Sequence, residues 1–383
     1  MRKIISMILS ICFLFTMITG CAQNNNVTKE SDRISVIATI FAPYDFVREV
    51  AGDDAEVTML LPPGSESHSY EPTPQDIINI QNCDVFIYIG GESDAWVDQI
   101  LESMDTSQMK IIAIMDCVDV VEEEVVEGME DGHDHDEDGH GEDGVHEDDH
   151  DHEEAHEDEH DGVHDEAHNH DEVHDDEHDG VYEDDHDEDE AHDEAYDDEV
   201  HDDHDEEPEF DEHVWTSPKN AKRIVQKIAD VLCEVDATHA KSYQERTAAY
   251  LSQLDELDAR FQEIVDNSVR QTLVFGDRFP FRYFADEYNL EYFAAFPGCS
   301  TETEASAATI AFLIDKVKAE SIPVVFHAEL SNQKMANTIS EETGAKVLLL
   351  HACHNITKDE MAQDATYIEL MEHNVENLKE ALN

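Results

Sequence analysis

Positive charge is the scarcest feature of this sequence. The 383 residues contain 22 Lys and Arg against 95 Asp and Glu, which gives a formal net charge of −73. No Lys or Arg occurs between Ile111 and Pro218. Outside the stretch from Val121 to Glu212, 45 acidic residues still face 22 basic ones over about 290 residues. Because nucleic acids are bound through basic surfaces, this charge argues against a nucleic-acid partner.

Cysteines are few and widely separated. The chain has seven: Cys12 and Cys21 lie close to the N-terminus, and five are scattered over the rest. An odd, scattered set argues against a disulfide framework, so most of these thiols are expected to be small buried core residues. The five are Cys83, Cys117, Cys233, Cys299 and Cys353.

The N-terminus also lacks an apolar run long enough to identify it as a membrane-spanning helix. The apolar run from Ile4 to Ile18 follows Arg2 and Lys3, and it is shorter than the roughly 20 residues that a spanning helix needs. This pattern is typical of an export signal. The signal ends in Ile-Thr-Gly followed by Cys21, which resembles the lipobox of bacterial lipoproteins. The resemblance implies cleavage before Cys21, lipidation of its thiol and anchoring to the outer face of the bacterial cytoplasmic membrane.

Histidine and acidic residues are concentrated in one stretch, Val121 to Glu212. It holds 17 of the 24 histidines and 50 acidic residues. Such a stretch cannot bury enough apolar surface to offset its ordering entropy, so it is expected to be disordered. Imidazoles and carboxylates bind borderline divalent metals, so the stretch is a candidate weak collector of zinc; the alternative is a solvated insertion without a role. The accessory metal-collecting histidines are His133, His135, His140, His146, His150, His152, His156, His160 and His164.

Two motif-like patterns in the acidic stretch are expected by chance. His146 to His150, His152 to His156 and His156 to His160 match HExxH, a motif that needs a stable helix to bind metal. A calcium-loop pattern begins at Asp134 but has Val145 at the twelfth position, where Glu is required. Protease and calcium-loop chemistry are therefore not expected.

Outside the acidic stretch, short apolar segments alternate with helical patterns, which predicts parallel sheets with crossover helices. A helical pattern of roughly 30 residues without Pro or Gly, from Thr238 to Asn267, is long enough to connect two lobes. The predicted fold class is α/β, with two lobes that each hold a central, mostly parallel sheet flanked by helices, joined by a long backbone helix. The expected strands are residues 33–40, 56–61, 84–89, 110–115, 272–275, 290–296, 323–327 and 345–350, and the expected helices are 44–51, 73–82, 96–104, 218–235, 238–267, 283–288, 304–321, 332–343 and 366–382.

The predicted domain organisation follows from these changes in composition. Two lobes are expected because single hydrophobic cores rarely exceed ~250 residues. The chain is divided into a signal peptide at 1–20, a tether at 21–32, an N-terminal lobe at 33–120, the acidic insertion at 121–209, the remainder of the N-terminal lobe at 210–237, a linking helix at 238–269 and a C-terminal lobe at 270–383.

Two loops carry histidines with informative neighbours. His68 begins His-Ser-Tyr-Glu-Pro-Thr-Pro-Gln-Asp, and His213 lies in Asp-Glu-His-Val-Trp-Thr-Ser-Pro. Loops that follow the strands of α/β sheets are where ligands bind. These loops resemble the zinc- and manganese-binding lipoproteins of ABC importers, in which HxYEPxPxD and DxHxWxxP carry the first two histidine ligands. The resemblance covers essentially the whole chain except the tether and the acidic stretch, and it implies metal ligation by His68 and His213.

The second half of the chain departs from the pattern of this family. In the family that the chain resembles, the third ligand lies shortly before an aromatic stretch that corresponds here to Pro280 to Phe284. This register puts Arg278 at the ligand position, and Arg cannot ligate a cation. Asp277 would replace it if the loop shifts by one residue; the alternative is that Asp277 pairs with Arg278 or caps a turn. His351 occupies the fourth position, directly after the last predicted strand, and His354 is a second candidate. Either histidine could supply the missing third ligand.

Glu329 and His327 end another predicted strand. The family keeps a Glu there, so Glu329 is a further candidate that is interpreted as supporting the ligands or the fold, and His327 as a core residue. Three histidines and one carboxylate suit tetrahedral zinc. Such a site also accepts manganese, but raw affinity favours zinc. The predicted ion is therefore Zn²⁺, with Mn²⁺ as the alternative.

The resemblance implies a function in metal import. The expected protein is an exported, monomeric, non-enzymatic zinc-binding component that delivers its ion to an ABC permease and the associated ATPase. Ligation from both lobes would couple binding to lobe closure or ordering. The alternatives are a manganese- or iron-binding member of the same family, and a surface adhesin or general metal buffer. A zinc hydrolase would need an open coordination position and a general base.

Overall fold

The computed structural model describes residues 33–66, 70–129, 209–300 and 305–383. These ranges belong to one unit of the chain, and a second unit, residues 134–206, lies outside them. Cys21, His68, the accessory histidines and the predicted export signal also lie outside the described residues.

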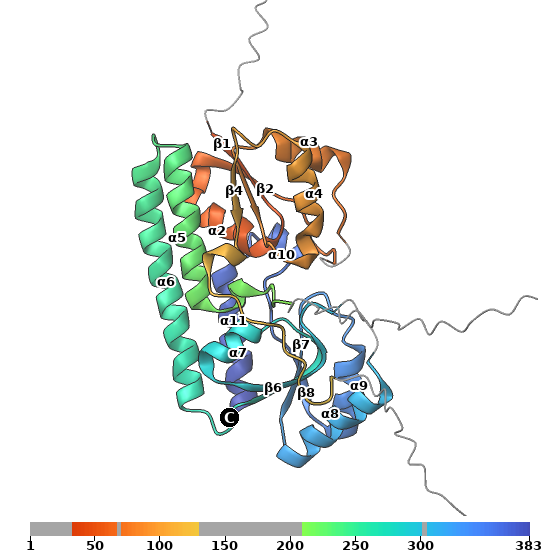
Figure 1. Ribbon diagram of the computed structural model, residues 1–383. Helices are drawn as coiled ribbons and strands as arrows, with labels where there is room; N and C mark the ends of the chain where they lie inside the picture. Colours follow the sequence, from red (N-terminus) through yellow and green to blue (C-terminus); the bar gives the residue numbers. More distant parts are fainter. Residues whose placement is uncertain (1–32, 67–69, 130–208, 301–304) are drawn as a thin grey trace, which may run out of the picture. The chain divides into compact units, whose positions relative to one another are not determined.

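The N-terminal lobe is built on a four-stranded parallel sheet in the order β2-β1-β3-β4 (Figure 1). The order reverses between β1 and β3, and in open parallel sheets such a switch point is where ligands bind. Thr73 and Asp76 form a capping box at the start of α3, directly after the Pro-rich loop. The elements are β1 (Ile34–Ala38), α2 (Phe41–Ala51), β2 (Ala55–Met59), α3 (Pro74–Asn82), β3 (Val85–Tyr88), α4 (Ala95–Ser103) and β4 (Lys110–Ala113).

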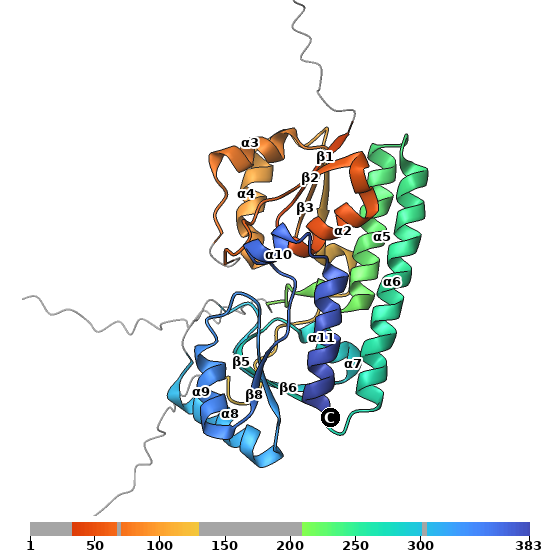
Figure 2. The ribbon, with the colours of Figure 1, turned by 180° about the vertical axis from the view of Figure 1, so that it is seen from behind.

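The C-terminal lobe repeats this plan. Its sheet is parallel in the order β6-β5-β7-β8, so the order again reverses between two central strands, β5 and β7. Helices alternate with the strands, as crossover connections require. The elements are β5 (Thr272–Phe279), α7 (Arg282–Tyr288), β6 (Glu291–Pro297), α8 (Ala307–Glu320), β7 (Val324–His327), α9 (Lys334–Thr343), β8 (Lys346–Leu349) and α11 (Tyr367–Leu382). Between β8 and α11 the chain returns to the N-terminal lobe, where the short helix α10 (Lys358–Ala362) lies (Figures 1 and 2).

Two antiparallel helices, α5 (Pro218–Val235) and α6 (Ala240–Asp266), join the lobes. They lie side by side in both ribbon views (Figures 1 and 2). Helix α6 packs against α2 and α5 at the N-terminal lobe and against α7 and α11 at the C-terminal lobe. The long helix therefore contacts both lobes.

One hydrophobic core runs through both lobes. It contains residues of the N-terminal sheet, of α5 and α6 and of the C-terminal sheet in a single cluster. Its centre is rich in fully buried aromatic side chains, and the Phe46 and Tyr367 rings meet edge to face at 4.9 Å. A continuous apolar core of this kind opposes free motion of one lobe against the other.

The two-lobed α/β fold predicted from the sequence is confirmed. Each predicted strand and helix of the lobes is present, with ends that differ by a few residues. Strand β5 extends to Phe279, four residues beyond its predicted end, and the short helix α10 was not predicted. Residues 121–129 are described and adjoin the folded part, since Glu122 pairs with Phe210 in an isolated antiparallel bridge. The predicted domain boundaries stay predictions. In the part of the chain that the structure describes, no helix has the length and apolar character needed to cross a membrane.

Candidate metal centre

His213 lies in a buried loop that leads into α5. Only 1% of its surface is exposed. Asp211 Oδ1 accepts the backbone N–H of His213 at 2.8 Å and lies 3.3 Å from its ring Nδ1. On the other side of the loop, Ser217 caps α5 and Trp215 Nε1 donates to the carbonyl of Ala352 at 2.7 Å. An imidazole whose Nδ1 faces a carboxylate is typical of metal-binding histidines.

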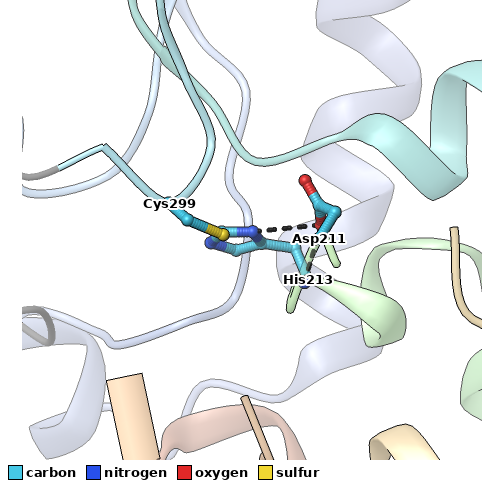
Figure 3. Close-up of side chains that lie close together, drawn as sticks. All are labelled: Asp211, His213 and Cys299. Atoms are coloured by element: carbon cyan, nitrogen blue, oxygen red, sulfur yellow. Dashed lines mark hydrogen bonds and ion pairs between the residues drawn. The ribbon is translucent and has the colours of Figure 1, made fainter. Parts of the chain in front are cut away.

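A third potential ligand reaches this pair from the C-terminal lobe. One ligand atom each of Asp211, His213 and Cys299 lies within 4.8 Å of the other two (Figure 3). Cys299 follows β6, and its backbone N–H donates to Glu123 Oε1 at 2.8 Å. Gly298 permits the close approach, because a Cβ there would lie 3.0 Å from Asp211 Oδ2 and 3.3 Å from His213 Cε1.

His354 also lies beside His213. Their ring centroids are 5.4 Å apart, and the His354 ring lies 5.1 Å from that of Trp215. The position of His354 depends on Glu329, whose two carboxylate oxygens accept the backbone N–H groups of Ala352 at 2.7 Å and His354 at 2.8 Å. Glu329 therefore supports the loop of a candidate ligand, as interpreted from the sequence.

The loop of His354 is bonded directly to the loop that precedes His68. Asn355 Nδ2 donates to the carbonyl oxygens of Pro62 at 2.9 Å and Ser65 at 2.8 Å. The N–H of Gly64 donates to the carbonyl oxygen of Ile356 at 2.7 Å. These bonds fix the described residues on the N-terminal side of His68 against the C-terminal lobe.

A small pocket opens where the strand order of the N-terminal sheet reverses. It is lined at the carboxyl ends of β1 and β3 by Thr39 and Ile89, and His354 lies in its wall. The sequence-based expectation that ligand groups gather at the strand ends of α/β sheets is met here by a residue of the other lobe.

His351 occupies a different environment from His213. Its ring Nδ1 accepts the backbone N–H of Cys353 at 3.0 Å and lies 3.8 Å from Glu329 Oε2. Its Nε2 lies 3.8 Å from Glu360 Oε1, beyond hydrogen-bond distance. Burial opposes a charge on His351, but the two carboxylates outweigh it and raise the pKa of the imidazole; the imidazole in turn lowers the pKa of Glu360 to about 2. Among the described residues, the structure does not bring His351 into the group around His213.

Asp277 is engaged at the end of β5. Its Oδ1 accepts the backbone N–H of Arg278 at 2.9 Å, and its Oδ2 accepts that of Ala328 at 3.2 Å. Arg278 Nη1 lies 3.5 Å from Glu66 Oε2, an ion pair between the two lobes. In the described ranges, Asp277 is not part of a potential metal-binding group. Ligation by His68, His213, His351, His354 and Asp277 stays a prediction.

The group around His213 is strongly acidic. Burial raises the pKa of the Cys299 thiol, and the charges of Asp211 and Glu123 raise it further. Burial also raises the pKa of Glu123. Burial opposes a charge on His213, but Asp211 outweighs it and raises the pKa of this imidazole above 6.5. A divalent cation would offset the negative charge of these groups and favour the ligating forms of all of them.

A family model described as zinc-uptake complex component A, periplasmic, matches residues 36–381 of the chain. This chain belongs to that family. The match spans both lobes and includes His213, Cys299 and His354. Membership of this family agrees with the group of potential metal ligands around His213. It also agrees with the family that the two histidine loops resemble.

Curated relatives cover nearly all of the chain. The zinc-binding lipoprotein AdcA of Streptococcus pneumoniae (strain ATCC BAA-255 / R6) is 28% identical over 382 residues, which are 99% of this chain and 61% of AdcA. The chain thus spans about three fifths of the length of that relative. The high-affinity zinc uptake system protein ZnuA of Bacillus subtilis (strain 168) is 25% identical over 376 residues, which are 98% of this chain and 96% of ZnuA.

Solved structures agree with the fold. The Zn(II)-bound ZnuA-like domain of Streptococcus pneumoniae AdcA matches with a TM-score of 0.62 at 24% identity, covering 91% of this chain and 99% of that domain. The metal-dependent lipoprotein YcdH of Bacillus subtilis matches with a TM-score of 0.63 at 22% identity, covering 92% of this chain and all of the other. Both matches confirm the two-lobed fold.

Sequence reasoning did not single out Cys299 or Asp211. Cys299 is among the cysteines expected in the core, although it comes three residues after Phe296, the predicted end of a strand, and directly follows Gly298. Its place after the carboxyl end of a parallel strand is the signal that could have identified it. Asp211 lies in the quoted His213 motif, but its role as acceptor from His213 is visible only in the structure.

Proposed function

We propose that this chain is the zinc-binding component of an ABC importer, which captures the ion outside the cytoplasmic membrane and delivers it to a permease and its ATPase. The observation that carries the proposal is the buried His213, held by Asp211 and adjoined by Cys299 and His354, in a chain of the zinc-uptake family. Imidazole nitrogens suit zinc better than manganese, which prefers oxygen ligands. The relatives named for zinc binding or zinc uptake support the same cargo.

The proposed ligands come from both lobes. His213 and His354 lie close enough for their rings to face one ion, and His68 follows a loop that is hydrogen-bonded to the loop of His354. His351 and Asp277 are retained as less direct candidates, since both are engaged elsewhere in the described structure. Glu329 acts by holding the backbone of His354.

Two further parts of the proposal concern Cys21, which lies outside the described ranges, and the acidic stretch, which lies largely outside them. Cys21 would carry the lipid anchor on the outer face of the membrane, as the lipobox resemblance implies. The acidic, histidine-rich stretch would collect zinc weakly and raise its concentration near the lobes. No covalent chemistry is proposed, because binding and release of the ion are sufficient for import. The monomeric state is likewise a proposal.

A chelator-competition titration tests the proposed function. A competing chelator masks weak sites in the acidic stretch, so only a tight site is counted. We expect one tight zinc per chain, weaker manganese binding, and loss of the tight site in His213→Ala. The exposed His373 provides the matched control, and His373→Ala should retain the tight site. Tight manganese with weak zinc would change the cargo, and a tight site unaffected by His213→Ala would contradict the proposed function.

A further inference from the structure

Several contacts fix the position of Cys299. Its loop is fixed on one side by the hydrogen bond from its N–H to Glu123 and on the other by Gly298, which has no room for a side chain beside Asp211 and His213. The strand before it is anchored by Tyr292, whose ring stacks on Phe279 at 3.6 Å. These contacts hold the thiol in the group that contains the buried His213.

Few other side chains at this edge of the C-terminal sheet are placed to ligate a metal ion beside His213. Arg278, at the end of β5, pairs with Glu66, and Asp277 accepts two backbone N–H groups. The ring of His351 faces Glu329 and Glu360, with a nitrogen–oxygen distance of 3.8 Å to each. Of the described residues of this lobe, Cys299 is the one whose ligand atom falls in a group with His213.

We propose that Cys299 supplies a thiolate ligand to the ion bound by His213, and that this sulfur makes the site selective for zinc over manganese. The inference rests on the proposed function and adds a ligand to it. On binding, the thiol releases its proton to solvent as the sulfur–metal bond forms. His213 would bind through Nε2, because Asp211 holds Nδ1. Soft thiolate ligands favour zinc, whereas manganese prefers oxygen donors.

The distances are compatible with one ion. A tetrahedral zinc with bonds of about 2.0–2.1 Å to nitrogen and about 2.3 Å to sulfur keeps these two atoms roughly 3.6 Å apart. In the structure, one ring nitrogen of His213 and the sulfur of Cys299 lie within 4.8 Å of each other, so a modest approach of the two side chains brings both within bonding distance of one ion. Asp211 would remain behind His213 as the acceptor for Nδ1–H, an orientation that strengthens a histidine ligand.

A second group contains the same cysteine. Glu123, Glu209 and Cys299 also place ligand atoms within 4.8 Å of one another. Glu123 already accepts the N–H of Cys299, and Glu209 is exposed, so the buried group with His213 is the better site. Variants of the two groups give different results, and the experiment includes both.

Cobalt substitution tests the proposal on the whole chain. Cobalt bound to a thiolate gives a charge-transfer band in the near ultraviolet, and the acidic stretch contains no cysteine. We expect one equivalent of cobalt to produce the band in the unaltered protein, Cys299→Ser and His213→Ala to abolish it, and Cys117→Ser to retain it. Cys117 is the matched control because its thiol is partly buried, like that of Cys299, and belongs to neither group of potential ligands among the described residues. Loss of the band in Glu209→Gln with retention in His213→Ala would assign the cysteine to the second group and overturn the proposal.

Metal affinities complete the test. Cys299→Ser should weaken zinc by at least roughly tenfold and leave manganese nearly unchanged. Equal losses for both ions, or none for zinc, would overturn the inference. Zinc should also slow alkylation of Cys299 in the unaltered protein, measured by mass spectrometry, which needs no variant to fold. Tight, His213-dependent zinc binding without the band or the protection would refute the thiolate ligand and leave the proposed function intact. Absence of any tight zinc would refute both.

Discussion

Asp211 determines how His213 presents its ring. The carboxylate accepts the backbone N–H and faces Nδ1, so the imidazole is fixed in orientation and tautomer. The same carboxylate raises the pKa of His213, which makes the proton a stronger competitor for the ring. The residue that prepares the ligand therefore also makes metal binding sensitive to pH.

Zinc affinity should fall as the pH decreases. A histidine ligand must be neutral, and the pKa of His213 lies above 6.5, so protonation begins to compete at a higher pH than for a free imidazole. We expect affinity to fall with decreasing pH over the whole range, because the Cys299 thiol also loses its proton on binding, and to fall more steeply below the pKa of His213. Chelator-competition titrations between pH 8 and pH 5.5 measure this dependence; a constant affinity over that range would contradict the assignment of His213.

Asp211→Asn separates the two effects of the carboxylate. The amide oxygen can still accept the Nδ1–H, but the negative charge is removed. We expect zinc affinity at pH 8 to fall roughly 10- to 100-fold, and the steeper loss of affinity that comes from protonation of His213 to begin at a lower pH. An unchanged pH profile in this variant would show that Asp211 does not control the protonation of His213.

The residues could be predicted from the sequence only where a motif extends over several positions. His213 was identified because Asp211, Trp215 and Pro218 accompany it in a pattern. Cys299 has no such pattern, since its partners Glu123 and His213 are distant in sequence. The family pattern favours His351 over His354, because His351 occupies the fourth ligand position. In the structure it is the ring of His354 that lies beside His213 and Trp215, and these tertiary contacts leave no local pattern in the sequence.

At the scale of elements, the loop after β8 depends on one carboxylate. Glu329 accepts two backbone N–H groups of that loop, and its side chain is 6% exposed. The segment also includes Cys353 at a positive φ of 58°, a conformation that costs energy for a residue with a side chain. The hydrogen bonds to Glu329 help to hold the loop in this shape.

Glu329→Ala should destabilise the protein by about 2–4 kcal/mol, because two buried N–H groups lose their acceptor. Denaturant unfolding of the metal-free protein measures the change in the free energy of unfolding. Glu376 pairs with Arg260 on the surface, so Glu376→Ala is the control and should change stability by less than about 0.5 kcal/mol. Equal effects of the two substitutions would contradict the role of Glu329.

Helix α2 is joined to the start of α11 by a buried carboxyl group. Asp45 Oδ2 accepts the N–H of Tyr367 at 2.8 Å, and burial raises the pKa of Asp45 to about 7. This folded-state pKa lies above the unfolded value, so the folded protein retains a proton that the unfolded chain releases. The contribution to stability is therefore present at low pH and is lost as the pH rises from about 4 to about 7.

Asp45→Asn should remove this dependence. The amide keeps an acceptor for Tyr367 and carries no charge to bury. As the pH rises through this range, the free energy of unfolding of Asp45→Asn should increase relative to that of the unaltered protein, by up to about 1.4 kcal/mol per pH unit. Denaturant unfolding at pH 4, 5.5 and 7 measures it. A difference that does not vary with pH would contradict the raised pKa.

The alternation of apolar strands and helical patterns predicts the order of the elements, but it does not predict the residues at which they end. Strand β5 runs past its predicted end because Gly276 allows the backbone to approach Ala336 of α9, where a Cβ would lie 2.5 Å from backbone atoms. A register shift between Phe275 and Arg278 follows it. Such a contact between distant segments leaves no local pattern in the sequence, and it helps to set the position of Asp277 and Arg278.

At the scale of the whole molecule, the lobes share one core along α5, α6 and α11. Ion pairs and hydrogen bonds between the lobes, such as Arg278 with Glu66 and Asn355 with Pro62, add to it. Binding is therefore expected to order loops around the ion more than to swing one lobe against the other, which refines the expectation of lobe closure.

The shared core predicts one cooperative unfolding transition. Amides of β1 in one lobe and β7 in the other should exchange with solvent through the same global opening, and zinc should slow both equally. Native-state hydrogen exchange with increasing denaturant measures the free energies of opening. Two sets of amides with distinct free energies, one in each lobe, would contradict a common core.

The central claim is that one zinc ion is held by the buried group around His213 with sulfur from Cys299. X-ray absorption at the zinc edge tests it most directly. The whole chain is first stripped of metal with a chelator and then loaded with less than one equivalent of zinc, so that only the tightest site is filled. The account predicts one sulfur at about 2.3 Å together with imidazole nitrogens at about 2.0–2.1 Å, and loss of the sulfur in Cys299→Ser. A spectrum with only nitrogen and oxygen neighbours in the unaltered protein would contradict it.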